Sequence, residues 1–114
     1  KGKTVIIYDD LIATGDSILN AANEAMRRGA QQVYCVAPHG VFSTKKNSTM
    51  TAEEKFRQAG IKTMITESIP RSEAYRQENK EWLTVLPLDG LLARVITEAS
   101  AVGGSVNRLI GRRP

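Results

Sequence analysis

The sequence is poor in cysteine, histidine and aromatic residues, with one cysteine, one histidine and 5% aromatic side chains among 114 residues. A lone cysteine excludes a disulfide framework, and the apolar run Val33–Ala37 around Cys35 indicates a small core residue. The chain shows no secretory leader and no apolar run near the roughly 18 residues that a membrane-spanning helix needs. We therefore expect a cytoplasmic protein without a membrane partner.

The sequence also lacks a concentrated basic stripe. Its net charge of +4 comes from 16 basic and 12 acidic residues, and the basic ones are scattered in short pairs such as Lys45-Lys46 and Arg112-Arg113. A nucleic-acid-binding domain would gather such residues on one surface and interleave aromatic ones. We predict no nucleic-acid partner, whereas a modest positive field suits a small anionic ligand.

Apolar runs alternate with helical patterns along the chain. Thr4–Tyr8 is almost continuously apolar, as in a strand buried on both faces of a parallel sheet. A helical repeat follows from Ser17, and Gly29 is placed to end it in a left-handed conformation. A second strand at Val33–Ala37 completes a strand–helix–strand unit, which implies a parallel sheet.

The second half of the chain continues this alternation. Thr51 and Glu54 predict a capping box for a short helix that ends near Gly60. Strands are expected at Ile61–Ile65 and Trp82–Leu86, with a polar loop or helical turn at 71–80 between them. Asp89 is expected to cap a last long helix, and a final short helix is expected around Val106, Leu109 and Ile110. The face of the long helix would be formed by Leu91, Leu92, Val95, Ile96 and Ala99.

The turn after the first strand carries the candidate chemistry. Asp9 and Asp10 follow the strand, and their carboxylates are suited to accept hydrogen bonds from sugar hydroxyls or to lie in the outer shell of a magnesium ion. Thr14-Gly15-Asp16-Ser17 then opens a helix, whose free amides and dipole favour an anion. The spacing predicts a sugar-phosphate site.

Residues Val5 to Ser17 resemble the phosphoribosyl-pyrophosphate signature of type I phosphoribosyltransferases. A resemblance to ribose-phosphate pyrophosphokinases covers nearly the whole chain. It is carried by Gly2-Lys3, Arg28-Gly29-Ala30, Val33-Tyr34, His39-Gly40-Val41-Phe42-Ser43, Thr66-Glu67-Ser68-Ile69-Pro70 and Val85-Leu86-Pro87-Leu88. The fold expected from this reading is a three-layer, phosphoribosyltransferase-like α/β domain, with a mostly parallel sheet of about four strands flanked by helices.

The resemblance implies an enzyme that transfers the pyrophosphoryl group of ATP to ribose 5-phosphate with Mg²⁺, giving phosphoribosyl pyrophosphate and AMP. Asp9 and Asp10 would hold the ribose hydroxyls, and Ala13, Thr14, Gly15, Asp16 and Ser17 would surround the 5-phosphate. The family's ATP-binding and catalytic residues lie in an N-terminal half that this sequence does not contain. We therefore expect residues 1–114 to be one domain, the C-terminal portion of a two-domain, homo-oligomeric enzyme, and to be inactive alone.

The sequence departs from the pattern of these kinases at two places. Ala13 stands where most of them carry aspartate, and Asp16-Ser17 replaces glycine followed by threonine. A carboxylate in a phosphate cradle would repel the ligand unless it turned away to cap the helix, and the sequence leaves both orientations of Asp16 open. Two alternatives remain open: a nucleobase phosphoribosyltransferase, and a non-catalytic regulatory homologue of the kinases.

The remaining conspicuous side chains are interpreted as structural. His39 follows a strand end in a Pro-His-Gly turn, where a structural role is the favoured interpretation. Lys45, Lys46 and Arg71 are suited to contact phosphates from a neighbouring domain or subunit, but solvated charges are the favoured interpretation. Packing is the interpretation for the aromatic residues Phe42, Tyr75 and Trp82.

Overall fold

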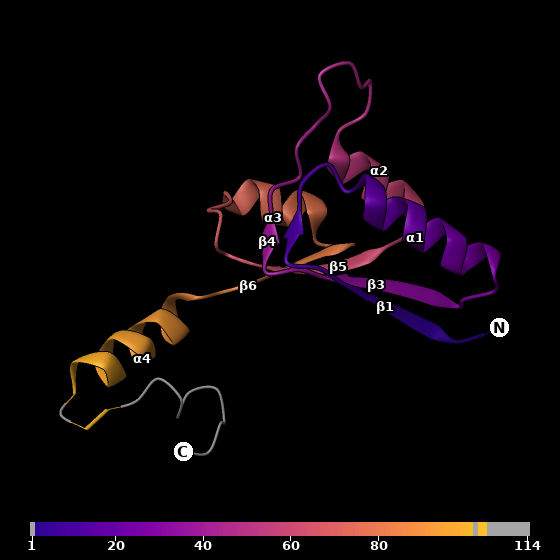
Figure 1. The fold of residues 1–114 in the computed structure, drawn as a ribbon. Helices are drawn as coiled ribbons and strands as arrows, with labels where there is room; N and C mark the ends of the chain where they lie inside the picture. The colour runs from indigo at the N-terminus through magenta and orange to yellow at the C-terminus, as the bar shows by residue number, and fades with distance from the viewer. Residues whose placement is uncertain (1, 102, 105–114) are drawn as a thin grey trace.

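The computed structural model describes residues 2–101, 103 and 104, which form an α/β fold around a four-stranded parallel sheet (Figure 1). The strand order is β1-β3-β5-β6, and the register aligns Val5 with Val33, Cys35 with Thr63 and Ile65 with Val85. The strands are β1 (Thr4–Tyr8), β3 (Gln32–Val36), β5 (Lys62–Thr66) and β6 (Leu83–Leu86). The predicted α/β class with a four-stranded parallel sheet is confirmed.

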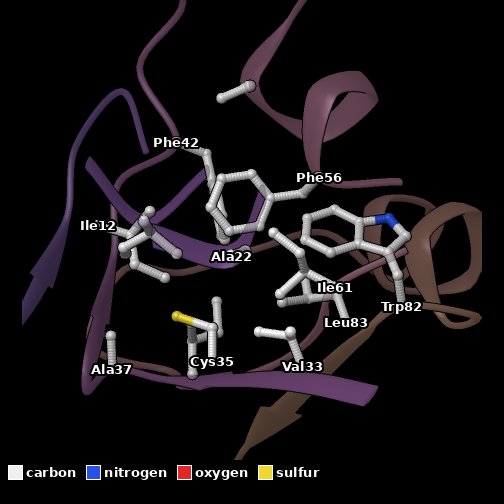
Figure 2. Packing of buried hydrophobic residues seen from close by; sticks show 13 residues of the cluster. Ile12, Ala22, Val33, Cys35, Ala37, Phe42, Phe56, Ile61, Trp82 and Leu83 are labelled. Carbon is white, nitrogen blue, oxygen red and sulfur yellow. The ribbon is translucent and has the colours of Figure 1, made fainter. Parts of the chain in front are cut away.

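Three helices cover one face of this sheet, namely α1 (Asp16–Arg27), α2 (Ala52–Ala59) and α3 (Glu73–Asn79) (Figure 1). Between them and the strands lies the hydrophobic core, where the rings of Phe42, Phe56 and Trp82 meet with centroids 5.5 to 5.8 Å apart (Figure 2). Cys35 is fully buried beneath them, as its apolar neighbours predicted. The packing roles predicted for Phe42, Trp82 and Tyr75 are confirmed.

The opposite face of the sheet is not covered by any described element. Ile6 and Tyr8 of β1 are 67% and 72% exposed, and Tyr34 and Met64 of the next two strands are also exposed. The expectation that Thr4–Tyr8 is buried on both faces was therefore wrong, because only its alternate residues Val5 and Ile7 pack against the core. The described residues supply two of the three expected layers.

Helix α4 (Asp89–Ser100) extends away from the sheet (Figure 1). Its expected apolar face is present but none of its residues is buried, with Ile96 65% exposed. Asp89 does not cap it, since Leu88 occupies the N-cap and Asp89 Oδ1 accepts from the amide of Gly90. Val106, Leu109 and Ile110 lie outside the described residues. Among the described helices, none is both long and apolar enough to cross a membrane.

Local sequence signals placed several element ends correctly. Thr51 and Glu54 form the predicted capping box of α2, and Gly60 ends that helix with φ 69°. Gly29 follows α1 with φ 93°, also as predicted. The 71–80 segment folds into α3, which begins at its N-cap Ser72 and is more regular than the loop or helical turn expected.

Candidate functional site

Asp9 and Asp10 directly follow strand β1, at the carboxyl edge of the sheet. Both are exposed, and Asp9 Oδ1 accepts a hydrogen bond of 2.8 Å from the amide of Asp10. The amide of Asp9 donates to the carbonyl of Val36, so the backbone continues the β1–β3 ladder up to this residue. In a parallel sheet, ligands bind outside this edge, and both carboxylates are accessible to one there.

A short second sheet holds the turn after Asp10. Strand β2 (Leu11–Ile12) pairs in parallel with β4 (His39–Gly40), a contact that the sequence interpretation missed. Ile12 is fully buried, and its carbonyl accepts from the amides of Val41 at 2.8 Å and Phe42 at 3.2 Å. The only sequence signal was the apolar pair Leu11-Ile12 inside an otherwise polar turn.

Gly15 is the N-cap of α1, and two independent constraints require glycine there. Its φ of 80° lies in the left-handed region, where a Cβ is disfavoured. A Cβ at this position would also lie 2.3 Å from Cε1 of Phe56, so the turn is wedged against the aromatic core. No side chain caps the helix, and the amide of Asp16 makes only a long contact of 3.5 Å with Oγ1 of Thr14, so the first amides remain available to an anion.

A cavity of about 140 Å³ opens at this turn. All the predicted site residues except Asp10 line it, together with three apolar neighbours: Asp9, Leu11, Ile12, Ala13, Thr14, Gly15, Asp16, Ser17 and Ile18. The turn therefore brings carboxylate, hydroxyl and helix N-terminal groups around one hollow. Ala13, with its methyl side chain, is exposed at its rim.

Of the two orientations that the sequence left open for Asp16, the structure does not show the helix cap. Asp16 is the first residue of α1, and its carboxylate forms ion pairs with Lys45 and, at 3.9 Å, with Nζ of Lys55. The hydrogen bond from Lys45 is the largest cause that lowers the pKa of Asp16 below its ordinary value of 3.8. Lys45 was expected to be a solvated charge and is instead paired with a predicted site residue.

Arg71 is also engaged rather than solvated, contrary to expectation. Its Nη2 donates to the carbonyls of Gly40 at 2.6 Å and Val41 at 2.9 Å, and its guanidinium lies 4.8 Å from the ring centroid of Tyr75. Phe42, which follows these carbonyls, adopts φ 53°, a conformation uncommon for a non-glycine residue. Arg71 therefore fixes the strained segment that holds the turn of residues 11–13.

His39 and Cys35 lie near the site, and both have structural roles: His39 makes hydrogen bonds, and Cys35 is buried in the core. His39 Nδ1 is 2.8 Å from the hydroxyl of Ser68, and the amide of His39 donates to the carbonyl of Asp10. Burial first, and the charge of Asp9 second, raise the pKa of the Cys35 thiol to about 11. A thiol with that pKa is a poor nucleophile at neutral pH.

The acidic residues of the turn fit a magnesium ion only in a limited way. No cluster of three or more His, Cys, Asp or Glu side chains occurs within the part of the chain that the structure describes. Magnesium is commonly held by one or two carboxylates together with substrate oxygens and water. Asp9 and Asp10 fit that kind of shared, ligand-dependent site, whereas they do not form a closed protein cage.

Comparisons with known proteins agree in pointing to one family. Residues 1–98 match the phosphoribosyl synthetase-associated domain. The chain is 33% identical to a ribose-phosphate pyrophosphokinase of Prochlorococcus marinus over 102 residues, which cover 90% of the chain and 30% of the relative. It is 37% identical to the enzyme of that name from Corynebacterium efficiens over 110 residues, which cover 95% of the chain and 30% of the relative.

A solved structure is similar in fold and in sequence. The crystal structure of phosphoribosylpyrophosphate synthetase from Mycobacterium smegmatis matches with a TM-score of 0.69 and 33% identity. The match covers 88% of this chain and 32% of that one. The chain thus spans about 30% of the length of the curated relatives it matches.

Proposed function

The chain belongs to the phosphoribosyl synthetase-associated domain family, and on that premise we propose that it is the sugar-phosphate-binding portion of a ribose-phosphate pyrophosphokinase. The observation that carries the proposal is the turn from Asp9 to Ser17. It combines two exposed carboxylates, an uncapped helix start at Gly15 and one cavity between them. Sugar hydroxyls and a phosphate call for these two kinds of partner.

The proposed roles follow from the chemistry of each group. Asp9 and Asp10 accept hydrogen bonds from the ribose hydroxyls. The amides and hydroxyls of Thr14 to Ser17 donate to the 5-phosphate, for which the α1 dipole adds a favourable field. Ala13 contributes its backbone alone. When bound, Mg²⁺ would neutralise phosphate charge, with Asp9 and Asp10 in its outer shell.

Binding of ribose 5-phosphate by the 114-residue chain tests the proposal. Calorimetric titration should show saturable binding of ribose 5-phosphate, and weaker binding of inorganic phosphate, which lacks the hydroxyls. The paired change Asp9→Ala with Asp10→Ala should weaken ribose 5-phosphate binding about tenfold or more, because charged hydrogen-bond acceptors are lost. Binding of inorganic phosphate should stay within about twofold.

Asp89→Ala is the matched control, since it removes an exposed carboxylate at the start of α4, away from the turn. It should leave both affinities unchanged. No measurable binding of ribose 5-phosphate, or equal loss in the control and in the aspartate pair, would contradict the assignment of the site.

We further propose that this chain alone does not catalyse pyrophosphoryl transfer. The reaction requires ATP to be positioned in line with the sugar's 1-hydroxyl. The chain corresponds to about 30% of the length of its curated relatives, and the residues assigned here contact the sugar phosphate only. Incubation with ATP, Mg²⁺ and ribose 5-phosphate should give no AMP above the protein-free rate. Sustained AMP formation at a rate proportional to protein concentration would refute this.

A further inference from the structure

The carboxylate of Asp16 lies where it would weaken the proposed site. It lines the cavity beside Thr14 and Ser17, and a negative charge there repels a phosphate. The structure pairs this carboxylate with two lysines, Lys45 and Lys55. Two ammonium groups and one carboxylate leave one net positive charge at the start of α1. The aspartate that stands where the related kinases carry glycine therefore brings two lysines to the proposed anion site.

The two lysines are held differently. Lys55 lies on α2, its side chain is 26% exposed, and the helix that carries it is fixed by the Thr51–Glu54 capping box. Lys45 lies in the 41–51 segment, which rises beyond the starts of α1 and α2, and its side chain is 57% exposed (Figure 1). Lys45 is thus the cation whose ammonium group can reorient without moving a helix.

The base of the 41–51 segment is attached to the site itself. The amide of Ser43 donates to the carbonyl of Ala13 at 2.8 Å. Ser43 lies two residues before Lys45, and Ala13 lies three residues before Asp16. A hydrogen bond from the amide of Ser48 to the carbonyl of Lys45 closes a turn beyond it. The backbone of Lys45 is therefore anchored beside the cavity while its side chain remains largely in solvent.

We propose that Lys45 is a phosphate-binding residue of this site, docked on Asp16 in the free protein and transferred to the 5-phosphate when a sugar phosphate binds. This rests on the proposed function. A surface ion pair is screened by solvent and contributes little, whereas a phosphate monoester carries close to two negative charges at neutral pH. Phosphate thus outcompetes Asp16 for Lys45, while Lys55 continues to neutralise the carboxylate.

Titration of variants with ribose 5-phosphate tests the transfer. Lys45→Met should weaken binding about tenfold, which corresponds to about 1.4 kcal/mol, and Lys45→Arg should retain affinity within about threefold. Lys46→Met is the matched control, because it removes the adjacent exposed lysine, and it should leave affinity within about twofold. Equal affinities for Lys45→Met and the wild type, or equal losses in Lys45→Met and Lys46→Met, would overturn the proposal.

A double-mutant cycle separates transfer of Lys45 from simple repulsion by Asp16. Asp16→Asn should tighten ribose 5-phosphate binding in the wild type, since Lys45 no longer has a competing partner, and it should tighten binding less in the Lys45→Met background. The same gain in both backgrounds would mean that Asp16 only repels the ligand, and the proposal would fail.

The two proposals fail in distinguishable ways. Absence of ribose 5-phosphate binding by the wild type counts against the proposed function and against the role of Lys45 with it. Wild-type binding that depends on Asp9 and Asp10 but is insensitive to Lys45→Met counts against the role of Lys45 alone. Because Lys45 is exposed, unchanged circular dichroism of its variants is expected and shows that any loss is not due to unfolding.

Discussion

Helices α1 and α2 pack against each other, and they begin in opposite ways. Helix α2 starts with a complete capping box, in which Thr51 and Glu54 satisfy each other's backbone amides. Helix α1 starts at Gly15, with no side-chain cap. The start of α2 is completed by its own residues, whereas the start of α1 leaves donors for an external anion. The contrast shows which helix end contributes to stability and which is suited to binding.

The N-terminal ends of α1 and α2 also differ in what holds them in place. Gly15 is wedged against Phe56, a side chain of α2, so the uncapped turn is held from outside by the neighbouring helix. The carbonyls of Ile12 and Ala13 are held by amides of residues 41–43. The turn at α1 is thus held chiefly by neighbouring segments, and its own contribution is a long contact of 3.5 Å from the amide of Asp16 to Oγ1 of Thr14, which leaves its amides in place for a ligand.

The largest effect is expected for Gly15→Ala, compared with Gly60→Ala. Both residues have positive φ, so both variants incur backbone strain of about 1–2 kcal/mol. Only Gly15 faces a side chain within contact distance, and overpacking against Phe56 should add about 1–3 kcal/mol. Urea unfolding followed by Trp82 fluorescence measures both free energies of unfolding. Equal losses would show that the α1 turn is not wedged.

Thr51→Ala should separate stability from binding. Loss of the cap should lower the free energy of unfolding by about 1 kcal/mol, while ribose 5-phosphate affinity stays within about twofold, because the start of α2 does not line the proposed site. Denaturant unfolding and calorimetry on the same preparations provide both values. A drop in affinity comparable to that of a site variant would mean that the two helix starts are not independent.

The smallest effect concerns the pH dependence at Asp16. Its pKa is lowered in the folded protein, chiefly by the hydrogen bond from Lys45. The stabilisation from a lowered carboxylate pKa is present above the unfolded value, near 3.8, and is lost as the pH falls through the folded value. The unfolding midpoint in urea should therefore fall more between pH 6 and pH 3 for the wild type than for Asp16→Asn. Parallel declines would show that the ion pair does not contribute.

Local rules of sequence predicted the elements that depend on local physics. The capping box at Thr51, the left-handed Gly29, the helix end at Gly60 and the alternation of apolar runs with helical repeats all hold in the structure. The exposed face of β1 was missed because a continuous apolar run has no polar residues to indicate which side faces solvent. Asp89 was predicted to be the N-cap of α4, whereas the N-cap is Leu88, one residue earlier, a difference typical of helix ends.

The candidate site likewise has a part that the local sequence predicts and a part that it does not. Asp9, Asp10 and Thr14 to Ser17 are consecutive, so one turn was sufficient to predict that they act together. The partners of that turn come from distant segments: Phe56 behind Gly15, Lys45 and Lys55 on Asp16, and Arg71 on the carbonyls of residues 40 and 41. No periodicity or spacing in a single sequence identifies such pairs.

By itself, the sequence determined the order of the four main strands and of helices α1, α2 and α4, the parallel character of the main sheet and the extent of the turn after β1, because hydrophobic period, capping and glycine conformation act over a few neighbouring residues. The tertiary structure alone decided that Asp16 pairs with lysines instead of capping α1, that Arg71 is engaged instead of solvated, and which face of the sheet is covered. A charge pairs with whatever the folded chain brings within a few ångströms, and that proximity arises only when the helices pack on the sheet.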